Sequence, residues 1–454
     1  MRLHLLALSG LFLSTWAADE TQTTEQLRSL LTLDGTVTSL SDAETPTGNY
    51  ISYTSTRTLL TDHGGMVTGS ATSASSADTA LITESASENA TSTSTTSSLT
   101  VLSGGHTRLS NNSTANATST ATSTSAPPVN TQPCNNHPEF CARKYSNITM
   151  VAAHNSPFVQ PGSVAANQAL KVEDQLNDGI RMLQFQTHYT NNTIYLCHTS
   201  CELLNVGPLE DYFTTVTRWL RAHPYDVVTI MIGNYDYVAP GNFSSIIESS
   251  GLIDYVYTPP KIPMALNDWP TLSSMIFSGK RAVVFMDYQA NQTAYPWLMD
   301  EFSQMWETPF SPTDTDFPCT VQRPPGLSPQ DAQKRMYMAN HNLNLNVDLV
   351  GTNLLIPNTA LLNQTNAVEG YGSLGLMADN CTTKWNRPPN FLLVDYYNYG
   401  SFNGSVFEVA AQMNNVTYNQ QCCGIASGAI SLSPPGLAGT LLVLGVVQWM
   451  ANII

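Results

Sequence analysis

The chain has 454 residues, 8 cysteines and a formal net charge of −16. This acidic balance argues against a nucleic-acid-binding protein, which needs a basic surface, and it disfavours simple electrostatic attraction to anionic lipid. The even number of cysteines suits an oxidising compartment. N-glycosylation sequons recur along the chain, beginning for example at Asn147, Asn242, Asn291 and Asn403. Together these features predict a secreted glycoprotein.

The first 18 residues have the pattern of a signal peptide. Met1 and Arg2 precede the mostly apolar run Leu3–Leu13, and small residues end the segment at Ala18. A basic start, a short apolar stretch and small residues at the end are the parts of a cleavable secretion signal. The alternative, a membrane anchor, needs a longer apolar run.

Residues 19–130 are rich in Ser and Thr. Ala71–Ser98 and Asn111–Ser125 contain almost no large apolar residues, so they cannot bury enough surface to offset the entropy lost on ordering. This composition predicts a disordered, O-glycosylated segment. Leu27–Leu33 and Tyr50–Leu60 are more apolar and predict local structure within it.

From residue 131 to residue 423, short apolar runs alternate with helical patterns. The predicted buried strands are Ile148–Ala153, Ile180–Gln186, Thr193–Cys197, Val227–Ile232, Ala282–Met286, Met336–Ala339 and Phe391–Val394. Apolar residues at helical spacing predict helices over Val164–Asn177 and Pro208–Ala222. Pro259–Pro270 and Thr308–Pro329 are expected to be long loops. Repeated βα units with buried strands predict an α/β fold, a TIM-type barrel.

Four polar residues follow predicted strands. His154 and His198 each come directly after a strand, where α/β barrels place their reactive groups. As a pair they could act as a general base and a general acid. Asp287 and Asp395 occupy equivalent positions. Alone, either histidine would more often be structural, and Asp287 could equally cap a helix.

The eight cysteines allow several bridges. Cys134/Cys141 and Cys197/Cys201 are close enough for local disulfides, and Cys319/Cys381 could close a long loop, whereas the adjacent Cys422 and Cys423 are not expected to bond to each other. The sequence alone leaves the connectivity open. A zinc site is the rival interpretation, but the spacing does not fit it.

Residues 424–454 have the pattern of a second targeting segment. Leu437–Ile454 is largely apolar, has no basic residue after it, and follows a short spacer and the small residues of Gly424–Ala429. This order predicts a GPI-attachment signal over residues 424–454. An uncleaved tail anchor is the alternative.

Five segments carry a resemblance to a known family: Ala153–Ser156, Asp178–Leu183, Leu196–His198, His223–Ile230 and Asn390–Asp395. In their order and spacing they resemble the phosphatidylinositol-specific phospholipase C X-region superfamily, most closely its fungal secreted PLC-like phosphodiesterases. The resemblance covers roughly residues 147–401. It implies a TIM barrel in which an inositol 2-hydroxyl attacks a phosphodiester, with His154 as general base, His198 as general acid and Asp395 orienting the base.

The chain differs from that family at the positions that supply a positive charge to the phosphate. Metal-free bacterial members have an Arg on the second strand, two residues after an Asp. Calcium-dependent members have Glu and Asp at those positions and an Asn after the base histidine. Here the two positions are Gln184 and Gln186, with Asn155 after His154. Because hard cations prefer carboxylates, we predict no cofactor and at most weak Ca²⁺ binding.

The predicted substrate-contacting residues are Asn155, Gln184, Gln186, Asp287 and Tyr397. Tyr397, in a run with Tyr396 and Tyr399, would either wall a sugar or inositol ring or pack the barrel mouth. The resemblance and the targeting segments predict a cell-surface, GPI-anchored phosphoric diester hydrolase that acts on a phosphoinositide-like or glycerophosphodiester substrate. The alternative is a catalytically inactive barrel serving as a cell-wall or ligand-binding protein, because the two glutamines lack the charge that phosphate needs.

Overall fold

The computed structural model of the chain describes residues 50–59, 131–349 and 352–424. The predicted signal peptide, most of the Ser/Thr-rich segment and nearly all of the predicted GPI signal lie outside these residues. Within the described part of the chain, no helix combines the length and apolar character needed to cross a membrane.

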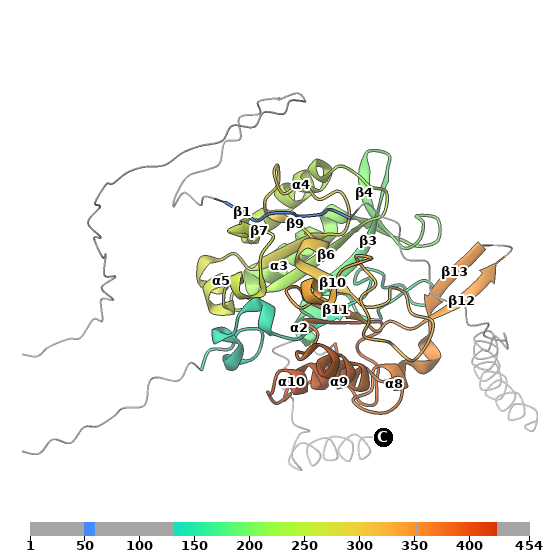
Figure 1. Cartoon of the computed structure of the whole chain (residues 1–454). Coiled ribbons are helices and arrows are strands. Elements are labelled where there is room, and N and C mark those ends of the chain that lie inside the picture. Colours follow the sequence, from blue (N-terminus) through green and yellow to red (C-terminus); the bar gives the residue numbers. More distant parts are fainter. Residues whose placement is uncertain (1–49, 60–130, 350–351, 425–454) are drawn as a thin grey trace, which may run out of the picture. The chain divides into compact units, whose positions relative to one another are not determined.

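Eight parallel strands form the centre of the fold, in the spatial order β10, β11, β14, β2, β3, β6, β8, β9. Their bounds are β2 (Met150–Ala153), β3 (Met182–Thr190), β6 (Val228–Asn234), β8 (Ala282–Met286), β9 (Leu298–Asp300), β10 (Met305–Glu307), β11 (Met336–Asn340) and β14 (Phe391–Val394). The predicted α/β barrel class is confirmed (Figure 1). Among the described strands, β9 and β10 are not paired with each other, so the sheet stays open there, and the short helix α6 (Glu301–Gln304) joins its two edges.

Helices follow most of the strands. They are α2 (Val172–Asp178), α3 (Leu209–Ala222), α4 (Pro240–Ser249), α5 (Leu272–Ser278), α7 (Pro329–Ala332), α8 (Leu362–Thr365), α9 (Leu374–Trp385) and α10 (Ser405–Met413). Short 3₁₀ turns lie at Pro138–Ala142, Tyr145–Asn147, Leu252–Tyr255, Leu266–Asp268 and Thr359–Leu361. Helix α3 agrees with the prediction: Pro208 is its N-cap residue, and its apolar face is buried.

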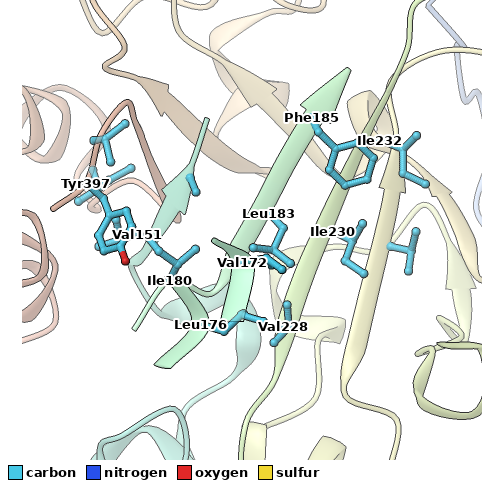
Figure 2. Close-up of a cluster of buried hydrophobic side chains, with 14 of the residues drawn as sticks. Val151, Val172, Leu176, Ile180, Leu183, Phe185, Val228, Ile230, Ile232 and Tyr397 are labelled. Carbon is cyan, nitrogen blue, oxygen red and sulfur yellow. The ribbon is translucent and has the colours of Figure 1, made fainter. Parts of the chain in front are cut away.

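Alternation along the strands separates two apolar layers. Leu183 and Phe185 of β3 and Ile230 and Ile232 of β6 face the same side (Figure 2), where they belong to one cluster with side chains of α2 and α3. The opposite faces point into the barrel. They form a methionine-rich interior that includes Met182, Met231, Met299, Met305, Met336 and Met338. Gln184 follows Met182 on this inner face of β3, so the interior becomes polar toward the carboxyl ends of the strands.

The strand predicted at Thr193–Cys197 exists as β4, but it is not a parallel barrel strand. It pairs antiparallel with the end of β3, with His188 opposite Tyr195, and then with β5 (Asn205–Pro208). Asn191 and Asn192 between the strands have φ values of 50° and 60°, as a two-residue hairpin turn requires. The prediction of a parallel strand was therefore wrong, and the hairpin returns His198 to the barrel rim.

The helix predicted over Val164–Asn177 begins only at Val172. Gln168 explains the difference, because its Nε2 donates to the backbone oxygens of His154 at 2.8 Å and Val394 at 3.0 Å. These bonds tie the segment before α2 to the ends of β2 and β14. Tertiary hydrogen bonds here outweigh the local helical pattern.

Four disulfides are present: Cys134–Cys141, Cys197–Cys201, Cys319–Cys381 and Cys422–Cys423. The first three were foreseen as possible bridges. The fourth was not, and that expectation was wrong: the Cα atoms of the two adjacent residues lie 3.1 Å apart, and their sulfurs are bonded.

Two antiparallel pairs lie beside the main sheet. One is the hairpin of β12 (Asn344–Leu349) and β13 (Thr352–Pro357). In the other, β1 (Arg57–Thr58) pairs with β7 (Lys261–Ile262), inside a stretch expected to be a long loop. The second pair places residues 50–59, which lie within the Ser/Thr-rich segment 19–130 predicted to be disordered, in the same compact unit as the barrel.

Candidate active site

His154 and Asp395 form a buried pair at the carboxyl ends of adjacent strands. His154 follows β2 and Asp395 follows β14, and the last residues of the two strands are in register. His154 Nδ1 lies 2.7 Å from Asp395 Oδ1. Because a carboxylate can only accept, Nδ1 carries the proton, and Nε2 is left with a free lone pair. This is the tautomer that a general base needs.

Asn167 supports the pair. Its Nδ2 donates to Asp395 Oδ1 at 2.9 Å and lies 3.3 Å from His154 Nδ1. Its Oδ1 accepts from Asn155 Nδ2 at 3.2 Å. Sequence reasoning missed this residue because it fell inside a predicted helix. The adjacent polar pair Asn167-Gln168 was the one available signal.

His198 is joined to the same network through Asn155. Its Nδ1 donates to the Ala165 carbonyl at 2.5 Å, and its Nε2 lies 3.3 Å from Asn155 Nδ2. The ring stacks on Phe158, with centroids 5.1 Å apart. The contacts fix a neutral imidazole with the proton on Nδ1. The structure thus brings the two predicted histidines into one hydrogen-bond network, in which the side chains of Asn167 and Asn155 connect the His154–Asp395 pair to His198.

A residue with left-handed backbone follows each of the three groups. These residues are Asn155 (φ 48°), Thr199 (φ 63°) and Tyr396 (φ 43°), after His154, His198 and Asp395. Such a φ is uncommon for residues other than glycine, and most of all for β-branched threonine. Strained backbone of this kind concentrates at functional sites, where the surrounding structure holds it in place.

Gln184 and Gln186 hold two of these turns. Gln184 Oε1 accepts from the Asn155 backbone N–H at 2.8 Å, and Gln186 Oε1 accepts from the Thr199 backbone N–H at 3.4 Å. Both glutamines also line a cavity at the barrel mouth. They therefore link the cavity wall to the segments that carry His154 and His198.

The cavity has a volume of about 410 Å³, within the range of small-molecule sites. Its polar wall includes Gln184, Gln186, Asp287, Glu301, Glu307 and Arg323. Its aromatic wall is formed by Tyr235, Tyr237, Tyr288 and Phe310. Ring faces beside hydrogen-bonding groups suit a polyhydroxylated ligand of modest size.

Arg323 is the one arginine or lysine among the described residues lining the cavity, and it is heavily engaged. Its Nη1 lies 3.1 Å and 3.2 Å from the two carboxylate oxygens of Glu307, and its Nη2 donates to the Tyr288 hydroxyl at 3.0 Å. Asp287 lies 3.7 Å away. Burial raises the pKa of Asp287 to about 6, and burial together with Glu307 raises the pKa of Glu301. Sequence reasoning missed Glu301, Glu307 and Arg323, because β9 and β10 are too short for a periodic signal and Arg323 lies in a loop.

Comparison with known proteins identifies the family. The family model described as PI-PLC X 1 matches residues 140–414.

The chain belongs to the PI-PLC X family.

Two relatives come from Arthroderma benhamiae. One, named "Uncharacterized secreted protein", is 61% identical over 355 residues and covers 77% of this chain and 80% of its own. The other, named "PI-PLC X domain-containing protein 1", is 44% identical over 270 residues, or 59% of this chain and 86% of its own. Among solved structures, phosphatidylinositol-specific phospholipase C from Listeria monocytogenes aligns with 12% identity and a TM-score of 0.40, over 64% of this chain and 98% of its own. The family match confirms the resemblance seen in the sequence.

The residues at the calcium positions of the PI-PLC X family do not fit that ion here. Gln184 Oε1 is already bonded to a backbone N–H. Asp287 Oδ1 accepts from the N–H groups of Asn234 and Tyr288, and its other oxygen faces Arg323. A neutral set with one engaged carboxylate lacks the ligand charge that Ca²⁺ prefers.

Tyr397 does not line the cavity. It is fully buried, and its hydroxyl donates to Asp178 Oδ2 at 2.5 Å. Of the two roles considered from the sequence, packing therefore fits and contact with a ligand does not. Arg181, at the start of β3, also bonds away from the cavity, to Asp226 at 2.7 Å.

His198 should titrate well below an ordinary histidine. Burial lowers its pKa to about 4, against an opposing effect of the Ala165 carbonyl, while His154 lowers it further and Asp395 raises it. Between pH ~6.5 and ~4 the unfolded chain binds this proton and the folded chain does not, so the residue reduces stability as the pH falls. We expect its ring C–H resonance to titrate near pH 4. A midpoint near 6.5 would contradict the burial described.

Proposed function

We propose that the protein is a secreted phosphodiesterase of phospholipase C type that acts on a phosphoinositide-like or glycerophosphodiester substrate. The observation that carries this proposal is the His154–Asp395 pair, joined to His198 through Asn167 and Asn155. The arrangement supplies a base with a free Nε2 and a second imidazole within one hydrogen-bond network. Neither imidazole lines the cavity itself, but the residues that follow them, Asn155 and Thr199, are bonded through their backbone N–H groups to Gln184 and Gln186 of the cavity wall. The walls of that cavity suit a polyhydroxylated group.

In the proposed reaction, a substrate hydroxyl next to the phosphodiester attacks phosphorus. His154 Nε2 removes the proton of that hydroxyl, and Asp395 stabilises the resulting imidazolium. The bond to the leaving oxygen breaks as His198 Nε2 donates a proton to it. The products are a cyclic phosphodiester and an alcohol. The pKa of His198 in the folded protein without a ligand is about 4. The negative charge of a bound phosphate is therefore needed to favour the protonated form of His198.

The test of this proposal is an assay of the purified full chain on phosphatidylinositol, glycerophosphoinositol and a GPI-linked substrate. Turnover of at least one of them, lost in His198→Ala, supports the proposal. No turnover of any, or equal turnover in the variant, would reject it.

Activity should persist in a chelator. The residues at the family's calcium positions are neutral amides beside one engaged carboxylate, Asp287, so any binding there should fall in the millimolar rather than the micromolar range. We expect turnover with EDTA to match turnover with added calcium. A steep rise at micromolar calcium that disappears in Asn155→Ala would contradict this prediction.

A second candidate function is ligand binding without catalysis. The state of Arg323 favours this candidate. Its positive charge is balanced by Glu307, so it would stabilise the charge that develops on a reacting phosphate only weakly. Binding of myo-inositol 1-phosphate, measured by calorimetry, without turnover of any substrate would favour this candidate. Turnover abolished by His198→Ala would reject it.

We further propose that the chain is secreted, glycosylated and held at the plasma membrane or cell wall by a GPI anchor. The apolar segments at residues 3–13 and 437–454 support secretion and anchoring, and the relative from Arthroderma benhamiae that is named a secreted protein supports secretion alone. Asn147, Asn242, Asn291 and Asn403 are all exposed, as sugar attachment requires. Deleting residues 425–454 is expected to move the protein from the cell surface to the medium. Retention at the surface would contradict the anchor.

A further inference from the structure

Residues Tyr50–Leu59, here called the strap, lie against the barrel although the Ser/Thr-rich run separates them from it in sequence. Arg57 and Thr58 pair with Ile262 and Lys261, and the Leu59 N–H donates to the Pro260 carbonyl at 2.8 Å. Arg57 Nη2 donates to the Gln292 carbonyl at 3.0 Å. The strap is thus fixed to β7 and to the loop after β8, and β1 can be followed beside β7 in Figure 1.

The strap reaches the place where the sheet is open. Tyr50 packs edge-on against Phe302 of α6, with ring centroids 4.8 Å apart. Tyr53 is half-buried and interacts with Ser303 of the same helix and with Asp300. Helix α6 joins β9 to β10 and begins with Glu301, a residue of the cavity wall. The strap therefore packs behind the part of the cavity wall formed by α6. At this place the edge strands β9 and β10 are not paired with each other among the described residues.

The strap also touches the residue that holds Arg323. The Tyr50 ring lies 5.8 Å from the Tyr288 ring, and the two hydroxyls are 3.5 Å apart. Because the guanidinium can only donate, the Tyr288 oxygen accepts from Arg323, and its own hydrogen is available to Tyr50. The Arg323 guanidinium lies over the rings of Tyr288 and Phe302, at 5.6 Å and 4.8 Å. Tyr50 thus packs against the same two rings as Arg323.

We propose that the strap is part of the ligand site and that Tyr50 is a positioning residue, which holds Tyr288, and through it Arg323, at the cavity wall. The barrel from residue 131 onward is then incomplete at this wall. The ligand class is a polyhydroxylated group, which the cavity suits, bearing one phosphate. The inference rests on the proposed function for that phosphate and for the kinetic readout, but not for the hydrogen-exchange readout.

The test uses the full chain with Tyr50→Ala, and Thr54→Ala as the matched control, because the Thr54 side chain is exposed in the same segment. An aromatic pair contributes about 0.5–1.5 kcal/mol, which corresponds to a factor of about 3–10. We expect Tyr50→Ala to weaken binding of myo-inositol 1-phosphate and raise KM by that factor, with kcat within about twofold. Hydrogen exchange in residues 287–297 should accelerate in Tyr50→Ala and stay unchanged in Thr54→Ala.

A double-mutant cycle separates positioning from general stabilisation. Tyr288→Phe removes the hydroxyl that accepts from Arg323, so its effect on inositol phosphate binding should be non-additive with that of Tyr50→Ala. Additive effects, or unchanged exchange over residues 287–297 in Tyr50→Ala, would overturn the inference. If the wild type turns over no substrate, the proposed activity fails, but exchange over residues 287–297 still decides the role of the strap.

Discussion

Replacing His154 with alanine is expected to lower kcat/KM by ~10²–10⁴-fold, the usual contribution of a general base. The variant loses the Nε2 proposed to accept the proton of the attacking hydroxyl. It also leaves the Asp395 carboxylate bonded to Asn167 alone among the described side chains. Asp395→Asn should also lower kcat/KM, by no more than His154→Ala does. The amide can hold the imidazole in the wrong tautomer and cannot offset the imidazolium charge, but the base itself is still present. Initial rates on the best substrate measure both variants.

His188→Ala is the matched control for this loss. Like His154, His188 contacts an aspartate, Asp236 at 3.1 Å, but it lies on β3 and, among the described residues, is not bonded to the network of His154, Asp395 and His198. Its replacement should leave kcat/KM within about threefold of wild type, since a change of that size corresponds to less than about 1 kcal/mol. Equal losses in the two variants would show that the damage is structural rather than catalytic.

Replacing Arg323 with methionine is expected to give the largest loss of stability, about 3–5 kcal/mol, because it removes one member of a buried ion pair. Glu307 would keep a buried charge without its cationic partner, although Asn340 Nδ2 still donates to it at 3.2 Å. Urea unfolding of the full chain, followed by fluorescence, measures the change.

The double variant Arg323→Met/Glu307→Gln tests the cause of that loss. Removing both charges should recover much of the stability, since neutral replacements of a buried pair often cost little. Lys334→Met breaks a pair in which both side chains are more than half exposed, so no measurable change is expected there. A double variant as unstable as Arg323→Met would mean that lost packing, not unpaired charge, dominates.

Most barrel strands and the residues that follow them could be predicted from the sequence, because buried parallel strands consist of short apolar runs. His154, His198 and Asp395 follow such runs, and all three meet at one site. The strand before His198 was misjudged in direction. Apolar content alone does not distinguish a parallel barrel strand from the second arm of a hairpin, and the deciding signal was the Asn191-Asn192 turn.

Other parts of the site depend on tertiary contacts that leave no local pattern. Asn167 reaches Asp395 from a segment that local spacing assigned to a helix. Arg323 comes from a loop and meets Glu307 and Tyr288 across the barrel mouth. The strap was recognised only as a more apolar stretch. Its partners Tyr288 and Phe302 are more than 200 residues away in sequence, beyond the reach of any periodicity argument.

The most direct test of the account is to identify the phosphorus product formed from glycerophosphoinositol by ³¹P NMR, with wild type, His154→Ala and His198→Ala side by side. The proposed mechanism predicts a cyclic phosphodiester signal that grows with wild-type protein and is at least ~100-fold slower to appear with His154→Ala. An unchanged substrate spectrum with wild type, together with calorimetric binding of myo-inositol 1-phosphate, would contradict it and identify the barrel as a binding protein.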